Sequence, residues 1–560
     1  MINDPEIKKL KWFISIFIAI LVFLLIINGV TQSHHQNKDK KQLPQQSWIS
    51  DNGDGTYTNP IIFADYSDPD VIRVGENFYL VSSSFAHTPG LPVLHSRDLV
   101  NWEIIGHAVQ NLPSPIFQTS QHGNGVWAPS IRFQNGEFWI FYGDPDLGIF
   151  MAKTKNPAGS WESPVLVKEA RGWIDPCPLW DDDGNAYLVH AWAKSRAGFN
   201  SILTINKLNP DGTRILDDGV TVFDGHGRHP TIEGPKIYKR NGYYYIFAPA
   251  GGVKNGWQTV LRSKYIYGPY EDKIVLEQGS TNINGPHQGA WVELASGESW
   301  FIHFQDREAY GRIVHLQPMQ WQNDWPNMGV DLDGNGIGEP ISIYRKPGIK
   351  KILSPVTIST SDDFDGESLG LQWQWQANFK NDWYSLVDKK GNLRLYAINP
   401  TSDSVNLWSL PNIIAQKFPA EEFDLVTKLS FHADQKDDKA GLIIFGNDYA
   451  TLTISKNDSA YLLEQVVCKN ASQGEPEVPI ESVILTSPDL YLKTCVQKNA
   501  VCTFSYSIDG SHYIPIGKEF QAVPGKWVGA KVGLFCTTAP HRKSSGYADL
   551  DFFQFTVYQQ

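Results

Sequence analysis

Three acidic residues stand at matching places in a repeated sequence pattern. Asp68 opens "DPDVIRVGENFYLVSSS", Asp175 opens "DPCPLWDDDGNAYLVHAW" and Glu233 opens "EGPKIYKRNGYYYIFAPAG". Acidic residues are poor strand formers, yet each of these precedes a short apolar run typical of a strand. A single residue of this kind is explained as a turn cap. Three at matching places are better explained as carboxylates that converge on one site.

Converging carboxylates are suited to hydrolysis of a glycosidic bond. Like charges at close range push their pKa values apart, so one group stays protonated while another stays ionised. The protonated group donates to the leaving oxygen, and the ionised group acts on water or on the sugar. Calcium binding is the competing use of clustered carboxylates. The absence of a compact ligand loop at these positions argues against it.

The pattern recurs five times and predicts the element that positions the acids. The two remaining repeats start at Ala128 and Gly289. Each repeat combines a short apolar strand, a turn with glycine and a strand rich in aromatic residues, which indicates a β-hairpin. The starts lie roughly 50 to 60 residues apart, a period typical of β-propeller blades. Because the first strand of each blade lines the central channel, the five starts are expected to meet at one end of it.

Composition supports an all-β protein and excludes one class of partner. The 560 residues are 12% aromatic and include 47 Gly and 34 Pro, which favours many strands and turns. The formal charge of -12 argues against nucleic acid, which requires a basic face. The same charge is compatible with a neutral sugar. One cysteine, Cys177, stands alone and four lie near the C-terminus, where disulfides and free buried thiols are both open interpretations.

The N-terminus carries the one membrane signal. Residues 12–30 contain no charge and follow Lys8, Lys9 and Lys11, and the run approaches the roughly 20 residues that a spanning helix needs. An uncleaved anchor is favoured over a signal peptide, whose apolar region is shorter. Both alternatives predict export to the periplasm or the extracellular space. Membrane contact through residues 12–30 is expected if the segment is not cleaved.

The rest of the chain is divided into two β domains. Residues 1–46 are predicted to be the anchor or signal segment with a polar tether, and residues 47–347 the five-bladed propeller. Residues 348–361 form a linker. Residues 362–560 contain repeated short strands with turn signals, typical of a β-sandwich. The predicted fold is therefore all-β, a five-bladed propeller followed by a jelly-roll sandwich, with one N-terminal hydrophobic helix.

Six motifs together resemble glycoside hydrolase family 43. They are "SDPDVIRVGENFYLVSSSF", "GVWAPSIR", "WIDPCPLWDDDG", "TIEGPKIY", "NGPHQGAWV" and "YGRIVHLQ", and the resemblance covers about residues 55–345. It implies an inverting mechanism with Asp68 as the general base, Glu233 as the general acid and Asp175 as the carboxylate that orients the sugar and raises the acid's pKa. Inversion requires the acid and base to lie roughly 6.5–9.5 Å apart. Asp70, two residues after Asp68, is interpreted as a structural acid.

The resemblance also implies further site residues. Phe85 and Trp127 match aromatic residues that wall the sugar site, and Arg312 is expected to hold a carboxylate or a sugar hydroxyl. The alternative for Arg312 is a surface residue. In relatives the histidine matching His287 lies in the channel near a calcium ion or water, so the resemblance implies a metal contact. The alternative is a buried core histidine. Calcium would be structural, since the chemistry requires no cofactor.

The resulting hypothesis is an exo-acting glycosidase. It would release β-D-xylosyl or α-L-arabinofuranosyl residues from plant-type polysaccharides or oligosaccharides. The segment from residue 362 resembles the concanavalin-like jelly-roll that follows family 43 propellers and that can lend a loop to the rim of the active site. A non-catalytic carbohydrate-binding propeller is the alternative function. It predicts that one of the three carboxylates is replaced, and none is. A structural propeller gives no reason for the three acids.

Overall fold

The computed structural model describes residues 47–348, 355–400, 405–457 and 460–559. The hydrophobic helix predicted for residues 12–30 and the polar tether after it lie outside these ranges. Within the described ranges, no helix is long and apolar enough to cross a membrane.

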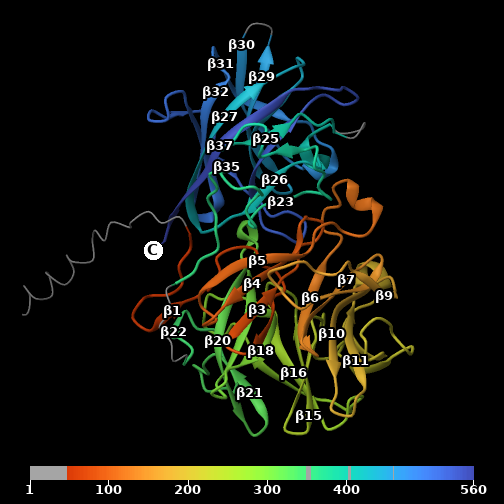
Figure 1. Cartoon of the computed structure of the whole chain (residues 1–560). Coiled ribbons are helices and arrows are strands. Elements are labelled where there is room, and N and C mark those ends of the chain that lie inside the picture. The colour runs from red at the N-terminus through yellow and green to blue at the C-terminus, as the bar shows by residue number, and fades with distance from the viewer. Residues whose placement is uncertain (1–46, 349–354, 401–404, 458–459, 560) are drawn as a thin grey trace, which may run out of the picture. The chain divides into compact units, whose positions relative to one another are not determined.

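The first half of the chain forms a five-bladed β-propeller, as predicted (Figure 1). Each blade is a four-stranded antiparallel sheet whose strands follow one another along the chain. Blades one to three consist of β2 (Asp70–Val74), β3 (Asn77–Val81), β4 (Gly90–Ser96) and β5 (Trp102–Val109); β6 (Trp127–Gln134), β7 (Glu137–Asp144), β8 (Gly148–Thr154) and β9 (Val165–Glu169); and β10 (Trp173–Trp180), β11 (Ala186–Trp192), β12 (Ile202–Leu208) and β13 (Val220–Asp224). Blades four and five consist of β14 (Lys236–Arg240), β15 (Tyr243–Ala250), β16 (Trp257–Ser263) and β17 (Glu271–Leu276); and β18 (His287–Glu293), β19 (Ser299–Asp306), β20 (Arg312–Gln322) and β21 (Trp325–Met328).

The ring is closed by contacts between its first and last blades. Strand β2 contacts both β6 and β18, so the first strand of blade one lies between those of blades two and five. The chain ahead of blade one also returns to blade five, where Ile62 and Val314 exchange backbone hydrogen bonds of 3.3 and 3.0 Å. Strand β1 (Thr56–Thr58) pairs with β22 (Ile343–Arg345) after the last blade. Both ends of the propeller segment are therefore fastened to the same side of the ring.

The backbone register corrects one detail of the predicted repeat. In each blade, a residue with positive φ lies one or two places before the point from which the first strand pairs with the second without interruption. In blades four and five that residue is Gly234 or Gln288, so the predicted starts Glu233 and Gly289 are each wrong by one position. The offset arises because the Gly234-Pro235 pair, rather than Glu233, matches Asp68-Pro69. The five equivalent residues are Asp68 (φ 54°), Ala128 (27°), Asp175 (57°), Gly234 (58°) and Gln288 (32°).

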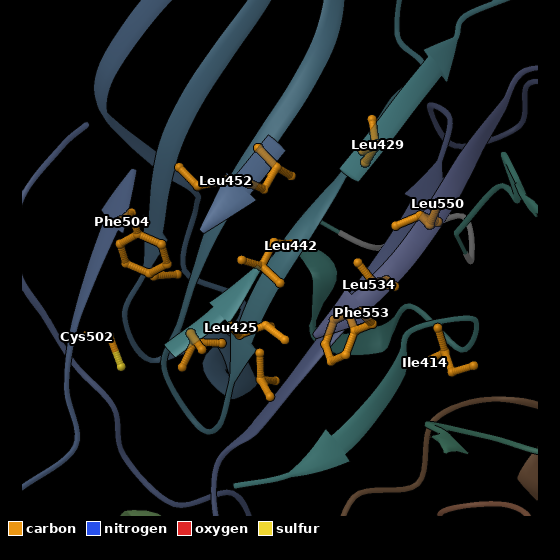
Figure 2. Close-up of a cluster of buried hydrophobic side chains, with 14 of the residues drawn as sticks. Ile414, Leu425, Leu429, Leu442, Leu452, Cys502, Phe504, Leu534, Leu550 and Phe553 are labelled. Carbon is orange, nitrogen blue, oxygen red and sulfur yellow. The ribbon is translucent and has the colours of Figure 1, made fainter. Parts of the chain in front are cut away.

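The second half forms a β-sandwich, which confirms the predicted fold class. Its two sheets pack a common hydrophobic core, to which Ile414, Leu442 and Leu534 contribute from one sheet and Leu425 and Phe553 from the other (Figure 2). One sheet consists of β23 (Gln374–Trp375), β26 (Ile414–Lys417), β36 (Lys531–Thr537), β28 (Lys439–Phe445), β29 (Tyr449–Asn457), β30 (Ala460–Cys468) and β31 (Val478–Leu485). The other consists of β24 (Tyr384–Ser385), β25 (Leu393–Tyr396), β37 (Tyr547–Tyr558), β27 (Glu422–His432), β32 (Asp489–Gln497), β33 (Val501–Ser507), β34 (Ile514–Pro515) and β35 (Phe520–Gln521).

The structure decides between the two interpretations of the cysteines, disulfides and free buried thiols. All five are free thiols, and four of them are buried. Cys502, for example, lies in the sandwich core beside Phe504 (Figure 2). The cysteines therefore act as small apolar core residues rather than as crosslinks.

Backbone hydrogen bonds join the propeller to the sandwich. The Thr88 N–H donates to the Trp375 carbonyl at 3.1 Å, and the Trp375 N–H donates back at 2.6 Å. The Ala530 N–H donates to the Ala309 carbonyl at 2.7 Å. Sandwich residues are thereby held beside the propeller loops that surround its channel.

Candidate active site

The seven predicted site residues all line one pocket, at the point where the first strands of the blades begin. Its volume is about 100 Å³. The predicted members are Asp68, Asp175, Glu233, Phe85, Trp127, His287 and Arg312, and the remaining lining residues are Ala128, Ile174, Val253, Gln288 and Trp527. The structure therefore brings together every residue that the sequence singled out for the site.

The register explains how Glu233 reaches this pocket despite its offset. Glu233 occupies the blade position just before the equivalent residue, the same position as Trp127 in blade two and His287 in blade five. This position and the equivalent position that follows it both contribute residues to the pocket. Two adjacent rings of side chains therefore build the site, one containing Asp68 and Asp175 and the other containing Glu233.

Left-handed backbone is concentrated around the pocket. Non-glycine residues seldom adopt positive φ, because the Cβ atom then meets the backbone. Residues in such conformations persist where the surrounding structure holds them, and they cluster at functional sites. Six lining residues other than glycine have positive φ, namely Asp68, Phe85, Ala128, Asp175, Gln288 and Trp527.

Asp68 is held by three hydrogen-bond donors. The hydroxyls of Ser67 and Ser83 donate to its Oδ2 at 2.7 and 2.6 Å, and Nη1 of Arg312 lies 3.1 Å from its Oδ1. The same guanidinium donates to Ser67 Oγ at 2.7 Å. Arg312 is only 9% exposed, so the alternative of a surface arginine is wrong. These hydrogen bonds fix the orientation of the Asp68 carboxylate.

Asp175 and Glu233 form a coupled pair of carboxyl groups. Burial, followed by the negative charge of Asp175, raises the pKa of Glu233 to about 8. Burial also raises the pKa of Asp175, to about 7; the Gly234 N–H, donating to its Oδ2 at 2.8 Å, opposes this rise and the charge of Asp68 adds to it. The amide hydrogen bond favours the ionised form of Asp175. Because the pKa of Glu233 is the higher of the two, Glu233 is the last of the pair to lose its proton.

His287 is a buried, neutral imidazole. The side chain is 1% exposed, and burial lowers its pKa to about 3. Neither ring nitrogen has a hydrogen-bond partner, although Nε2 lies 3.6 Å from Glu233 Oε1. Within the described residues, no group of three or more His, Cys, Asp or Glu side chains could hold a metal ion. Calcium takes six to eight oxygen ligands, which the imidazole ring does not supply, and the metal contact implied for His287 stays a prediction.

Asp70 has a different role from Asp68, although only one residue separates them. It is fully buried, and its Oδ2 accepts hydrogen bonds from Arg132 Nη1 at 2.7 Å and from the Ile131 N–H at 2.8 Å. Nη2 of Arg132 in turn lies 2.7 Å from Cys177 Sγ. Asp70 does not line the pocket. It joins the first strands of neighbouring blades, in agreement with its interpretation as a structural acid.

Trp527 is the lining residue that the sequence did not reveal. It comes from the sandwich, between β35 and β36, and its ring centroid lies 6.0 Å from that of Trp127. The segment is fastened to the propeller, because the Gly529 N–H donates to Asp65 Oδ2 at 2.9 Å. The resemblance allowed for a sandwich loop at the rim but indicated no residue. Nothing in the surrounding "PGKWVG" marks this tryptophan as part of a site over 200 residues away in the chain.

Comparisons with known proteins establish the family. The sequence model described as "Glycosyl hydrolases family 43" matches residues 57–326, and one described as "Beta xylosidase C-terminal Concanavalin A-like domain" matches residues 361–556. A protein of Xylanibacter ruminicola is 40% identical over 89% of both chains. A non-reducing end alpha-L-arabinofuranosidase of Bacteroides ovatus is 30% identical over 89% of this chain and 94% of its own.

A solved structure supports the same family assignment. The crystal structure of a family 43 protein from Bacillus licheniformis has a TM-score of 0.78 and 27% identity, and the match covers 90% of this chain and all of that one. Fold and site together define a carbohydrate-cleaving propeller enzyme. The chain belongs to glycosyl hydrolase family 43 and is a glycoside hydrolase. The non-catalytic alternatives are thereby set aside.

Proposed function

We propose that the protein removes single terminal β-D-xylosyl or α-L-arabinofuranosyl residues from plant-type polysaccharides or oligosaccharides, with inversion at the anomeric carbon. The observation that carries this proposal is a small pocket containing three carboxyl groups. Its volume of about 100 Å³ is well below the roughly 300–1,000 Å³ typical of pockets for drug-sized ligands, which suits a single sugar residue. The C-terminal family description and the arabinofuranosidase relative support the two sugars.

In the proposed mechanism each carboxyl group has one task. Glu233, which carries the proton of the pair, donates it to the departing glycosidic oxygen. Asp68, oriented by Arg312, accepts a proton from the water that attacks the anomeric carbon from the opposite face. Asp175, in its ionised form, keeps the pKa of Glu233 raised and orients the sugar. Phe85 and Trp127, whose ring centroids are 6.4 Å apart, provide apolar surfaces for the C–H faces of the sugar.

Inversion is tested by the anomer that is released first. With an aryl β-D-xyloside, proton NMR during the first turnovers is expected to show α-xylose, with the β-anomer appearing only by mutarotation. An aryl α-L-arabinofuranoside is expected to release the β-anomer first. A retaining glycosidase measured alongside serves as the control. Initial release of the same anomer as in the substrate would contradict the assigned roles of Asp68 and Glu233.

The pH profile tests the coupling between Asp175 and Glu233. Asp175→Asn removes a negative charge that raises the pKa of Glu233, so Glu233 should lose its proton at a lower pH. We expect the alkaline limb of kcat/KM, measured from about pH 5 to 9, to move to lower pH by on the order of one unit. Asp182→Asn, in an exposed hairpin turn, is the matched control and should leave the limb in place. An unmoved limb in Asp175→Asn contradicts the coupling.

A further inference from the structure

Five fully buried residues form a layer next to the catalytic pocket. Side chains two places apart on a strand lie on the same side of it, so the residues two places after the five equivalent positions lie one step further along the channel. We call these residues the second layer. They are Asp70, Ser130, Cys177, Lys236 and Ala290, and all five are 0% exposed.

Lys236 is the second-layer residue with a positive charge, and it lies close to Asp175. Its Nζ donates to the Pro129 carbonyl at 2.9 Å. Pro129 belongs to blade two and Lys236 to blade four, and strand β10 of blade three contacts the first strands of both. The lysine side chain therefore passes beside β10, the strand that contains Asp175. Gly234, two residues before Lys236, donates its N–H to Asp175 Oδ2 at 2.8 Å.

The charge of Lys236 has one carboxylate available to balance it. A buried ammonium group is costly unless another charge compensates it. Within the described residues, the Pro129 carbonyl is the only hydrogen-bond partner of Lys236 Nζ. Asp70 already belongs to a buried ion pair, and burial raises the pKa of the Cys177 thiol, which is therefore neutral at neutral pH. Asp175 is the remaining acid that can balance Lys236.

Lys236 lowers the pKa of Asp175. Burial is the largest influence on this carboxyl group and raises its pKa, and the charge of Asp68 raises it further. The Gly234 N–H and the charges of Lys236 and Arg312 lower it. Lys236 therefore favours the ionised form of Asp175.

Glu233, the other member of the coupled pair, is not affected in this way. Its pKa is raised by burial and by the charge of Asp175, and the charges of Arg312 and Asp68 shift it further. Lys236 is not among the charges that act on it. Arg312 acts on both carboxyl groups, so it separates them little. Lys236 acts on Asp175 alone and therefore makes the two groups unequal.

We propose that Lys236 is a positioning residue of the active site, the buried counter-charge that keeps Asp175 ionised while Glu233 keeps its proton. It lies outside the pocket and acts through Asp175 rather than on the sugar or the attacking water. The inference rests on the proposed function for the roles of the two carboxyl groups. It adds to them the group that decides which of the two ionises first.

The test is the pH profile of kcat/KM, measured with the full-length protein from about pH 4 to 9. The substrates are an aryl β-D-xyloside and an aryl α-L-arabinofuranoside. In Lys236→Gln the amide can still donate to the Pro129 carbonyl, but the charge is lost. Asp175 should then ionise at a higher pH, so we expect the acid limb to move to higher pH by on the order of one unit. The alkaline limb reports the proton of Glu233 and should move much less.

Three further variants separate the charge from a structural role. Lys236→Met lacks both the charge and the hydrogen bond, and it should move the acid limb as far as Lys236→Gln does. It also provides the measurement if Lys236→Gln does not fold. Lys239 lies on the same strand but pairs with Asp181 and Asp182, so Lys239→Gln should leave both limbs in place. In an Asp175→Asn background, Lys236→Gln should cause no further shift of the acid limb.

Three results would overturn the inference and leave the proposed function intact. The first is an active enzyme whose acid limb stays in place in Lys236→Gln and Lys236→Met. The second is a limb that moves in Lys236→Met alone, because the hydrogen bond to Pro129 would then be responsible. The third is a full shift that persists in the Asp175→Asn background. A wild type that hydrolyses neither aryl glycoside would instead overturn the proposed function, and it is recognised because no pH profile can be measured.

Discussion

Asp68→Asn and Glu233→Gln are each expected to lower kcat by about 10²–10⁴-fold, the contribution typical of a positioned general acid or base. Asp68→Asn removes the group that accepts the proton of the attacking water. Glu233→Gln removes the proton that the leaving oxygen needs. Both substitutions keep the size of the side chain, and the pocket that surrounds them is lined by residues of several blades. Steady-state rates on xylobiose, with circular dichroism to confirm folding, provide the measurement.

The acidity of the leaving group distinguishes the role of Glu233 as general acid from that of Asp68 as general base. An aryl glycoside with a strongly acidic phenol departs without a proton, so Glu233→Gln should lose much less activity on it than on xylobiose. Asp68→Asn should lose activity on both substrates alike, because the attacking water needs its base in either case. The exposed Asp182→Asn variant is the control for a general effect of removing one charge. Nearly full activity of either Asp68→Asn or Glu233→Gln on xylobiose would contradict the mechanism.

The second large effect that we expect is a loss of folding stability rather than of catalytic rate. Asp70→Ala leaves the guanidinium of Arg132 buried without its carboxylate, and removing one partner of a buried ion pair typically destabilises a protein by about 3–5 kcal/mol. It also removes the acceptor of the Ile131 N–H. We expect the free energy of unfolding of the propeller to fall by about that amount. Urea unfolding followed by tryptophan fluorescence, referred to the wild-type midpoint, measures it.

The control for this prediction is another acid that is exposed. Asp182→Ala, in the turn between β10 and β11, should change the free energy of unfolding by no more than about 0.5 kcal/mol. If Asp70→Ala does not fold, Asp70→Asn keeps an acceptor for the Ile131 N–H and is expected to give a smaller loss of the same sign. A midpoint equal to that of the wild type in Asp70→Asn and Asp70→Ala would show that the Arg132 pair does not stabilise the blades.

The five blades could be predicted from the sequence because a hairpin is a local structure. A turn such as that at Gly75, which has a φ of 64°, is followed directly by the aromatic strand that pairs back onto the preceding one. Strand, turn and partner lie within about 20 residues, so the pattern of residue types is enough to indicate them. The acids next to these strands could be recognised as a set for the same reason.

The relative positions of distant side chains could not be predicted in this way. The sequence placed Glu233 in the same ring as Asp68, whereas the backbone register shifts it by one residue into the ring of Trp127 and His287. It left Arg312 open as a surface residue, and only the packing of blade five beside blade one buries its guanidinium against Asp68. Each of these outcomes depends on contacts between segments far apart in the chain.

The sequence by itself determined the β architecture, the repeat and the acids of the site, since these follow from residue types within short windows. Tertiary structure alone decided which side chains share the pocket wall. Trp527 illustrates the reason: it reaches the pocket because Gly529 and Ala530 bond to Asp65 and Ala309 of the propeller. Neither partner carries a local signal, because a contact between two domains is specified by the surfaces of both and by no short stretch of either.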